Sequence, residues 1–305
     1  MSSPTHDRPP TIDPIAARRW DGRLAASSPW LHEEVARRME DRLQWILRDP
    51  PAWANWSALR GGLQGHGQVS KRYPKADVYI VEPHPQAEAV VRKAIGRPWW
   101  APAGWLGGKT RWGQPADASV GLVWANMGLH MAGDPQALLG QWRRALTHDG
   151  FVMFSALGPD TLRELRQLYS RLGWPAPAHE FTDMHDWGDM LVQAGFAEPV
   201  MDMERIVLTW PEPGALLREL RSLGSNLHPG RFAGLRGRRW RARLEHELTQ
   251  HLSTGEDGRL ALTFEIVYGH AFTAPPRVRA ASDTRISLDE MRVSLRQRNQ
   301  NLPKT

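Results

Sequence analysis

The sequence contains no cysteine, and that absence excludes several kinds of chemistry. Disulfide bonds, thiolate metal sites and cysteine nucleophiles all need a thiol. Lysine is scarce as well, since only five of the 39 basic residues are lysine and 34 are arginine. No uninterrupted apolar run approaches the roughly 20 residues that a bilayer-spanning helix needs, so no integral membrane protein is expected. No apolar stretch follows residues 1–10, so we expect no secretory signal and a cytoplasmic protein.

Positive charge is concentrated at one end of the chain. The formal net charge is +6, and residues 275–305 hold seven basic and three acidic residues, which is +4 of that total. The rest of the chain is nearly neutral, whereas a nucleic-acid-binding fold carries a basic face on its folded part. We therefore expect a basic flexible tail over 275–305 and no nucleic-acid partner. The alternative is nucleic-acid binding by the arginines of 277–298 alone.

Strand-like and helix-like segments alternate along the chain. Short apolar runs and helical periodicity predict strands at 77–82, 119–126, 151–155, 200–210 and 262–273, and helices at 86–95, 134–146, 159–172, 182–194 and 213–223. An earlier helix is expected to start at Ser28, whose hydroxyl can cap it, and to end before Asp49. The alternation predicts a doubly wound α/β protein: a mainly parallel sheet covered on both faces, with an antiparallel finish at one edge.

Several segments carry a family resemblance. They are Val123 to Met131, Asp134-Pro135, Gly150 to Ser155, Phe181 to Asp186, Ala194 to Phe196 and Thr263 to Ala271. In these segments the chain resembles class I S-adenosylmethionine-dependent methyltransferases. More narrowly, it resembles the biotin-pathway family that methylates the free carboxyl group of malonyl-acyl carrier protein. The resemblance is good from about 119 to 272 and weak from 50 to 118.

The resemblance implies a Rossmann-like domain with a seven-stranded sheet. It predicts an N-terminal extension over 1–27, partly disordered and helical, and a methyltransferase-like domain over 28–274. A helical lid is expected at about 211–260, between the last two strands. S-adenosylmethionine would be the cofactor and methyl donor.

Glu82 is the best candidate for a cofactor contact. It follows a predicted buried strand, and ligands of doubly wound sheets lie beyond the carboxyl ends of the strands. An acidic side chain there can accept hydrogen bonds from both ribose hydroxyls, although a solvated loop carboxylate is the simpler interpretation. The resemblance, aligned on Tyr73-Pro74, also places Glu82 at the family's ribose-binding carboxylate. It places Asn126, at the end of the next predicted strand, near the methyl group.

The segment that should approach the cofactor departs from the family. In the same alignment Ser57 replaces the family's first acidic residue, and its three glycines become Leu59, Gly61 and Leu63. Gly62, Gly65 and Gly67 stand nearby, so 61–67 is either a flexible surface loop or a rebuilt cofactor loop. We expect Gly61 and Gly62 to bind the cofactor if the loop is rebuilt. Neighbouring tryptophans could stack on adenine or pack in the core; they include Trp99, Trp100, Trp105 and Trp112.

Recognition of an acyl substrate with a free carboxyl group calls for a cation, and arginine binds carboxylates bidentately. The candidates are Arg221 and Arg231, with Asn226 between them in a segment that resembles the family's lid. The stretch 231–243 has six arginines and no acidic residue, so it could dock an acidic acyl carrier protein. A solvated helix face is the alternative. The histidines show no metal-ligand spacing, so no metal is expected.

Two functions remain open from the sequence alone. The first is S-adenosylmethionine-dependent O-methylation of an acyl-carrier-bound carboxyl group. Joining a sulfonium and a carboxylate consumes charge, so the reaction needs a dry, aligned site and no general base. The second is a catalytically degenerate relative that acts as a binding or scaffolding partner, because the glycine segment is eroded.

Overall fold

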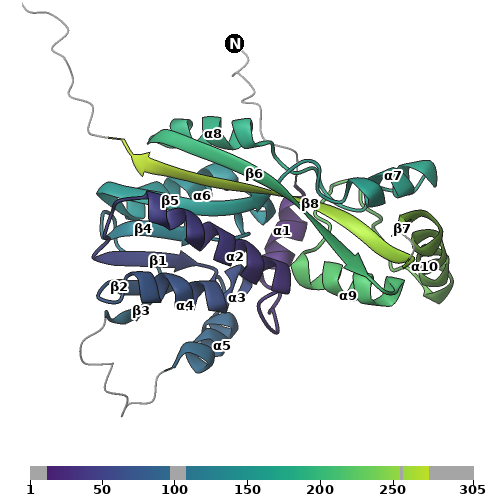
Figure 1. Ribbon diagram of the computed structural model, residues 1–305, viewed down its shortest axis with the longest axis horizontal. Helices are drawn as coiled ribbons and strands as arrows, with labels where there is room; N and C mark the ends of the chain where they lie inside the picture. The colour runs from purple at the N-terminus through teal and green to yellow at the C-terminus, as the bar shows by residue number, and fades with distance from the viewer. Residues whose placement is uncertain (1–11, 97–107, 255–256, 275–305) are drawn as a thin grey trace, which may run out of the picture. The chain divides into compact units, whose positions relative to one another are not determined.

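The computed structural model describes residues 12–96, 108–254 and 257–274, and these residues build one sheet with helices on both faces (Figure 1). Seven strands run in the order β3-β2-β1-β4-β5-β8-β6, and the short β7 pairs with β8. The strands are β1 (Ala52–Trp56), β2 (Asp77–Val81), β3 (Thr110–Trp112), β4 (Val120–Ala125), β5 (Leu146–Leu157), β6 (Phe196–Trp210), β7 (Ser253–Thr254) and β8 (Arg259–Thr273). Strands β1 to β5 pair in parallel, and β8 is antiparallel to β5 and β6. The doubly wound sheet with an antiparallel finish is confirmed.

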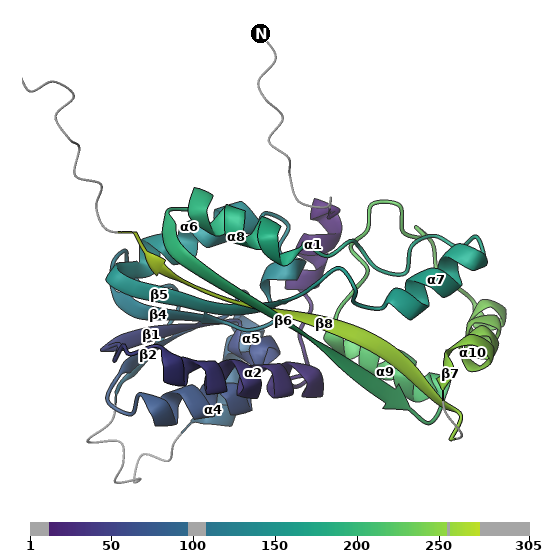
Figure 2. The same cartoon turned by 45° about the horizontal axis from the view of Figure 1, so that its top comes forward.

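Two apolar clusters bury the two faces of the sheet. The helices are α1 (Pro14–Asp21), α2 (Trp30–Arg42), α3 (Ala58–Gly61), α4 (Leu63–Arg72), α5 (Pro85–Ile95), α6 (Pro135–Ala145), α7 (Arg163–Arg171), α8 (Met184–Gln193), α9 (Pro213–Leu223) and α10 (Arg238–Leu252). One cluster joins the sheet to α2, α4 and α5, and the other joins it to α6 and α8. Figure 2 shows α6 and α8 on one face of the sheet and α2 and α4 on the other. No helix within the described residues is long and apolar enough to cross a membrane.

The start of the chain agrees with the predicted helical extension and differs from the sequence prediction in how α2 is capped. Helix α1 forms inside the predicted extension, where Trp20 packs against Met131 and Leu227. Helix α2 has Pro29 at its N-cap and no side-chain cap. The predicted cap, Ser28, instead donates a hydrogen bond to Leu59 O (2.8 Å). Its hydroxyl also accepts a hydrogen bond from Leu63 N at the start of α4 (3.1 Å). The hydroxyl therefore ties the chain entering α2 to the glycine segment.

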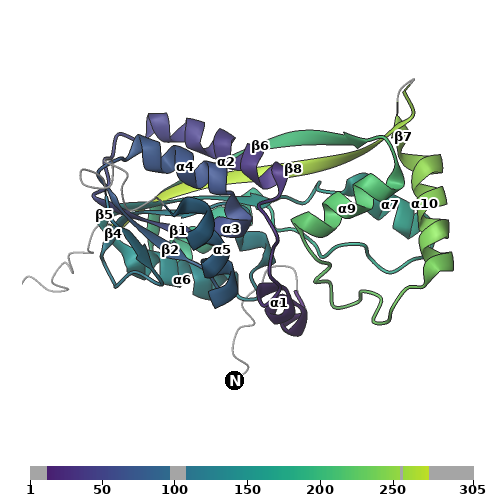
Figure 3. The ribbon, with the colours of Figure 1, turned by 90° about the horizontal axis from the view of Figure 1, so that it is seen from below.

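The expectation of a loop over 61–67 is wrong. Gly61 ends the single turn of α3, and α4 begins directly after Gly62, so Gly65 and Gly67 are helical. Helices α2 and α4 lie side by side, as Figure 3 shows, and the carboxylate of Glu33 on α2 accepts hydrogen bonds from two amides at the start of α4. A carboxylate at a helix N-terminus stabilises the helix through its unpaired amides and its dipole.

Strands β6 and β8 extend beyond the other strands toward α7, α9 and α10 (Figures 1 and 2). Helix α9 covers the predicted 213–223, and α10 follows it before β8 begins. Both helices lie in the segment 211–260 that was expected to form a lid. The predicted tail, 275–305, and residues 1–11 lie outside the described residues.

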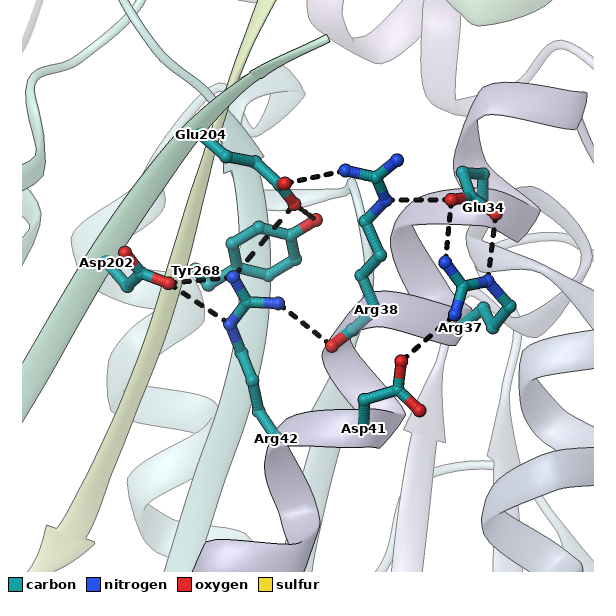
Figure 4. A network of polar contacts seen from close by, with 8 residues as sticks. All are labelled: Glu34, Arg37, Arg38, Asp41, Arg42, Asp202, Glu204 and Tyr268. Atoms are coloured by element: carbon teal, nitrogen blue, oxygen red, sulfur yellow. Dashed lines mark hydrogen bonds and ion pairs between the residues drawn. The ribbon is translucent and has the colours of Figure 1, made fainter.

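An ion-pair network joins α2 to the antiparallel pair of strands β6 and β8 (Figure 4). Arg38 binds Glu204 at 2.6 Å, and Arg42 binds Asp202 at 2.7 Å. The hydroxyl of the buried Tyr268 donates to Glu204 at 2.6 Å, and the guanidinium of Arg42 lies 3.7 Å from the centre of its ring. A shared network of this kind fixes the position of α2 more firmly than isolated surface pairs would. The network thereby holds in place the helix whose N-terminal part borders the candidate site.

Candidate functional site

A cavity of about 280 Å³ lies at the carboxyl ends of β1 and β4. Trp56 and Ser57 border it from the end of β1, and Asn126 borders it from the end of β4. Its apolar wall includes Trp142, whose ring meets Trp56 edge-on with the ring centres 6.2 Å apart. Ligands of doubly wound sheets bind at this edge, so this cavity is the candidate site. Four tryptophans were candidates to stack on adenine or pack in the core. Trp99, Trp100 and Trp105 lie outside the described residues, and Trp112 in β3 borders a different pocket.

Glu82 lies beside this cavity, and its carboxylate already accepts a hydrogen bond from the protein backbone. Its Oε1 accepts a hydrogen bond from Leu59 N at 2.8 Å. Burial raises the pKa of the Glu82 carboxyl group to about 7, against the lowering effect of the Leu59 amide and the Arg60 charge. The space beside the carboxylate is a pocket of only about 10 Å³, bordered also by Asp21, Leu59 and Arg60. This pocket is too small for a ribose, so its wall has to widen before a ribose can reach Glu82.

Asn126 is a buried crosslink. Its Nδ2 donates to His32 O at 2.8 Å and also to Gly61 O, and its Oδ1 accepts from Ser155 Oγ at 2.6 Å. The side chain borders the cavity with only 1% of its surface exposed. It therefore joins α2, the turn of α3 and the sheet at the floor of the site.

The two glycines predicted to bind cofactor face the protein. A Cβ on Gly61 would lie 3.1 Å from the carbonyl oxygen of Asn126, and Gly62 has a φ of +117° with Glu33 beside it. Gly65 lies even closer to its neighbour, because a Cβ added to it would lie 2.4 Å from the Cβ of Ala36 on α2. In this structure these glycines permit the close approach of α2 and the sheet.

The residues predicted to bind substrate are not among the described residues that line the cavity. Asn226 donates to Ala176 O at 2.7 Å and accepts from the amide of His228, so it orders its own loop. Arg231 binds Asp13, the cap of α1, at 2.7 Å. Arg221 is exposed on α9, whereas Leu223 of the same helix borders the cavity.

The cavity also has polar residues that the sequence did not single out. Asp21 from the end of α1, His32 from α2 and Arg60 from α3 all border it. The helical extension was predicted without bounds for its helix, and α3 was not predicted, so no sequence signal placed Asp21 and Arg60 at the carboxyl ends of the strands.

Three buried histidines lie close together: His32, which borders the cavity, and His130 and His179, which do not line it. Each has one nitrogen without a partner among the described residues. His32 Nδ1 donates to Arg60 O at 2.7 Å, His179 Nε2 donates to His130 O at 3.0 Å, and His130 Nδ1 accepts from Leu157 N at 3.3 Å. The unpartnered atoms are His32 Nε2, His130 Nε2 and His179 Nδ1. Burial lowers the pKa of His32 and His179 to about 4, and that of His130 well below its ordinary value. All three are neutral at pH 7. No group of three or more metal-binding side chains occurs among the residues that the structure describes.

The sheet order, the single antiparallel strand and the cavity beyond the strand ends define a class I S-adenosylmethionine-dependent methyltransferase fold. The solved YcgJ protein from Bacillus subtilis superimposes with a TM-score of 0.51, covering 79% of this chain and 98% of YcgJ. At 11% sequence identity, that likeness shows the fold alone.

Sequence relatives identify the family. No protein-family model matches the chain. The malonyl-(acyl-carrier protein) O-methyltransferase of Gallionella capsiferriformans is 37% identical over 280 residues, which cover 88% of this chain and 93% of that protein. The enzyme of the same name from Laribacter hongkongensis is 38% identical over 264 residues, covering 83% and 86%. This chain belongs to the malonyl-(acyl-carrier protein) O-methyltransferase family.

Proposed function

We propose that this chain methylates the free carboxyl group of malonyl-acyl carrier protein with S-adenosylmethionine as donor. The observation that carries the proposal is the similarity to enzymes of that name along most of both chains. The relatives are named as methyltransferases, which favours the enzyme over a non-catalytic binding partner. The cytoplasmic location remains a prediction from the sequence.

The cavity suits the cofactor in its size class and in its chemistry. At about 280 Å³ it lies just below the roughly 300–1,000 Å³ that is usual for ligand pockets, so binding would widen it slightly. Trp56 and Trp142 offer apolar surface for the base, and Asp21 and Arg60 offer charged groups for polar contacts. Glu82 would hold the ribose once the small pocket beside it widens, and Asn126 would keep the floor of the site rigid.

When bound, S-adenosylmethionine supplies a methyl group on a positively charged sulfur. The acceptor is a carboxylate, so the chain has to align two groups that attract each other and does not have to remove a proton. The apolar wall around Trp142 and Leu223 excludes water, which strengthens that attraction. We propose that 211–260 acts as the lid over this site, since α9 already contributes Leu223 to the cavity.

Titration with S-adenosylhomocysteine tests the cofactor site. We expect the wild-type chain to bind it, and Glu82→Gln to weaken binding by about tenfold or more, because hydrogen bonds to a charged group contribute roughly 1.5–3 kcal/mol. Glutamine keeps an oxygen for Leu59 N, so the thermal midpoint should hardly change. Glu245→Gln on α10 is the matched control and should leave affinity unaltered, since Glu245 pairs with Arg241 and does not line the cavity. If isothermal titration calorimetry detects no binding of S-adenosylhomocysteine to the wild-type chain, the cofactor proposal is refuted. If Glu82→Gln binds it with unaltered affinity, Glu82 is not part of the site.

We propose that the arginines of 231–243 dock the acyl carrier protein. Arg241 and Arg243 pair with Glu245 and Glu247 along α10, whereas Arg238 and Arg239 are exposed and have no ion pair among the described residues. Unpaired exposed cations leave a positive field that attracts an acidic partner.

Charge reversal tests this surface. The double variant Arg238→Glu/Arg239→Glu should slow association with malonyl-acyl carrier protein at low salt by about tenfold, and the difference should shrink at high salt because the charges are then screened. Arg18→Glu/Arg19→Glu, on the exposed side of α1, is the matched control. Equal association rates for wild type and variant at low salt would contradict the docking surface.

A further inference from the structure

Arg60 is a cation inside the candidate site. It belongs to the turn of α3, in the segment that replaces the family's glycines, and it borders both the 280 Å³ cavity and the small pocket beside Glu82. Its Nη2 donates to Trp20 O at 2.6 Å and also to Arg23 O, and its guanidinium lies 4.3 Å from the centre of the Trp20 ring. The N-terminal segment thus holds this side chain against the cavity.

The charge of Arg60 has no ion-pair partner among the residues that the structure describes. No carboxylate of the described residues lies within 4.0 Å of its guanidinium, although Asp21 and Glu82 act on it from further away. Burial lowers the pKa of Arg60, which reports that its charge is partly removed from water. Partly buried charges are ordinarily paired, because carbonyl dipoles and an aromatic ring compensate an ion less completely than an anion does.

The guanidinium also has donors to spare. Both hydrogen bonds that the described residues make with this side chain use Nη2, whereas a guanidinium carries five N–H groups on three nitrogens. Nε and Nη1 therefore remain, and each can donate a charge-assisted hydrogen bond to a carboxylate oxygen. Among the described residues that line the 280 Å³ cavity, Arg60 alone is an arginine or lysine.

We propose that Arg60 is the carboxylate-binding residue of this site, a role that rests on the proposed function. The predicted cations do not take this position, because Arg231 is paired with Asp13 and Arg221 does not line the cavity. Two carboxylates could occupy the position: the amino-acid carboxylate of the cofactor and the free carboxylate of the malonyl group. Asp21 borders the same cavity, so the pair of charges matches an amino-acid zwitterion.

Two titrations with Arg60→Gln separate the two carboxylates. S-adenosylhomocysteine carries the amino-acid carboxylate, and 5′-methylthioadenosine lacks it. If Arg60 binds the cofactor, the variant should bind S-adenosylhomocysteine about tenfold or more weakly, and 5′-methylthioadenosine as well as the wild type does. If Arg60 binds the acyl substrate, both nucleosides should bind normally, and KM for malonyl-acyl carrier protein should rise by about tenfold with a smaller change in kcat.

Arg60→Lys is the second variant in case glutamine disturbs the fold, and it should recover part of the affinity because it restores charge without the planar fork. Arg19→Gln on the exposed side of α1 is the control. Normal binding of both nucleosides together with a normal KM in a folded Arg60→Gln protein would overturn this assignment alone. A wild-type chain that binds neither S-adenosylhomocysteine nor the malonyl substrate would overturn the proposed function and this assignment together.

Discussion

Lowering the pH from about 8 to about 5.5 should reduce the free energy of unfolding by roughly 2–4 kcal/mol. Four buried histidines cause the loss. Burial lowers the pKa of His32, His66 and His179 to about 4, and that of His130 well below its ordinary value of 6.5. At pH 5.5 they remain neutral in the folded chain, whereas in the unfolded chain they are mostly protonated. The unfolded state binds more protons, so stability falls as the pH drops from about 6.5 toward 4.

The size of the effect follows from the pKa differences. Each histidine with a folded pKa of about 4 contributes a loss of roughly 1–1.5 kcal/mol at pH 5.5, which is about 4 kcal/mol for His32, His66 and His179 together, and His130 adds to this loss. Glu82 acts in the opposite direction, because its folded pKa of about 7 lies above its ordinary value of 4.5. Its protonation in the folded chain raises the free energy of unfolding by about 2 kcal/mol over the same pH range. Glu34, whose pKa is lowered to about 2 by its hydrogen bonds with Arg37 and Arg38, stays ionised in this window and adds little. The net loss is a large share of the roughly 5–15 kcal/mol that stabilises a typical domain.

Urea denaturation followed by tryptophan fluorescence at pH 8 and pH 5.5 measures this loss. His32→Gln should reduce the difference between the two pH values by about 1.4 kcal/mol, whatever it does to stability at pH 8. Val192→Ala on α8 is the control, because it removes an exposed side chain with no titratable group and should leave the difference unchanged. An unfolding free energy that stays constant between the two pH values would contradict neutral, buried histidines.

The sequence was most informative where hydrophobic periodicity was strong. Strand β2 and helix α9 were predicted to within a residue, because a short apolar run or an amphipathic face dominates each of them. Strand β1 was missed, since Pro50, Pro51 and the tryptophans around it do not form an alternating pattern. The glycine segment was mistaken for a loop because glycine disfavours helices, and only the contact with α2 makes a helix there favourable.

The candidate site was predicted less completely than the fold. The position of Glu82 follows from the strand before it, and the structure places it at the expected edge of the sheet. Arg60 could not be singled out among 34 arginines, because its role depends on Trp20 and Asp21 reaching the cavity from α1. Contacts between segments so far apart in the sequence leave no periodic signal.

Gly65→Ala should lower the free energy of unfolding by about 1–3 kcal/mol, the usual cost of overpacking a core. The new Cβ would lie 2.4 Å from the Cβ of Ala36, and both atoms are fixed to helices that the Glu33 contacts hold together. Alanine favours helices over glycine by about 1 kcal/mol, so any loss must come from this collision and not from backbone propensity. Gly67→Ala is the matched control: it lies in the same helix, nothing is within 4 Å of its Cβ, and it should be neutral or stabilising.

The compensating variant decides why this glycine is present. If Gly65 serves to let α2 approach, Ala36→Gly should restore most of the stability that Gly65→Ala loses, with a coupling energy of about 1–3 kcal/mol in urea denaturation. Affinity for S-adenosylhomocysteine should recover along with stability in the double variant. A Gly65→Ala protein that keeps its full stability but loses cofactor affinity, with no rescue by Ala36→Gly, would mean that this glycine faces the cofactor. Helix packing would then not explain why glycines persist in the segment where the family's pattern has eroded.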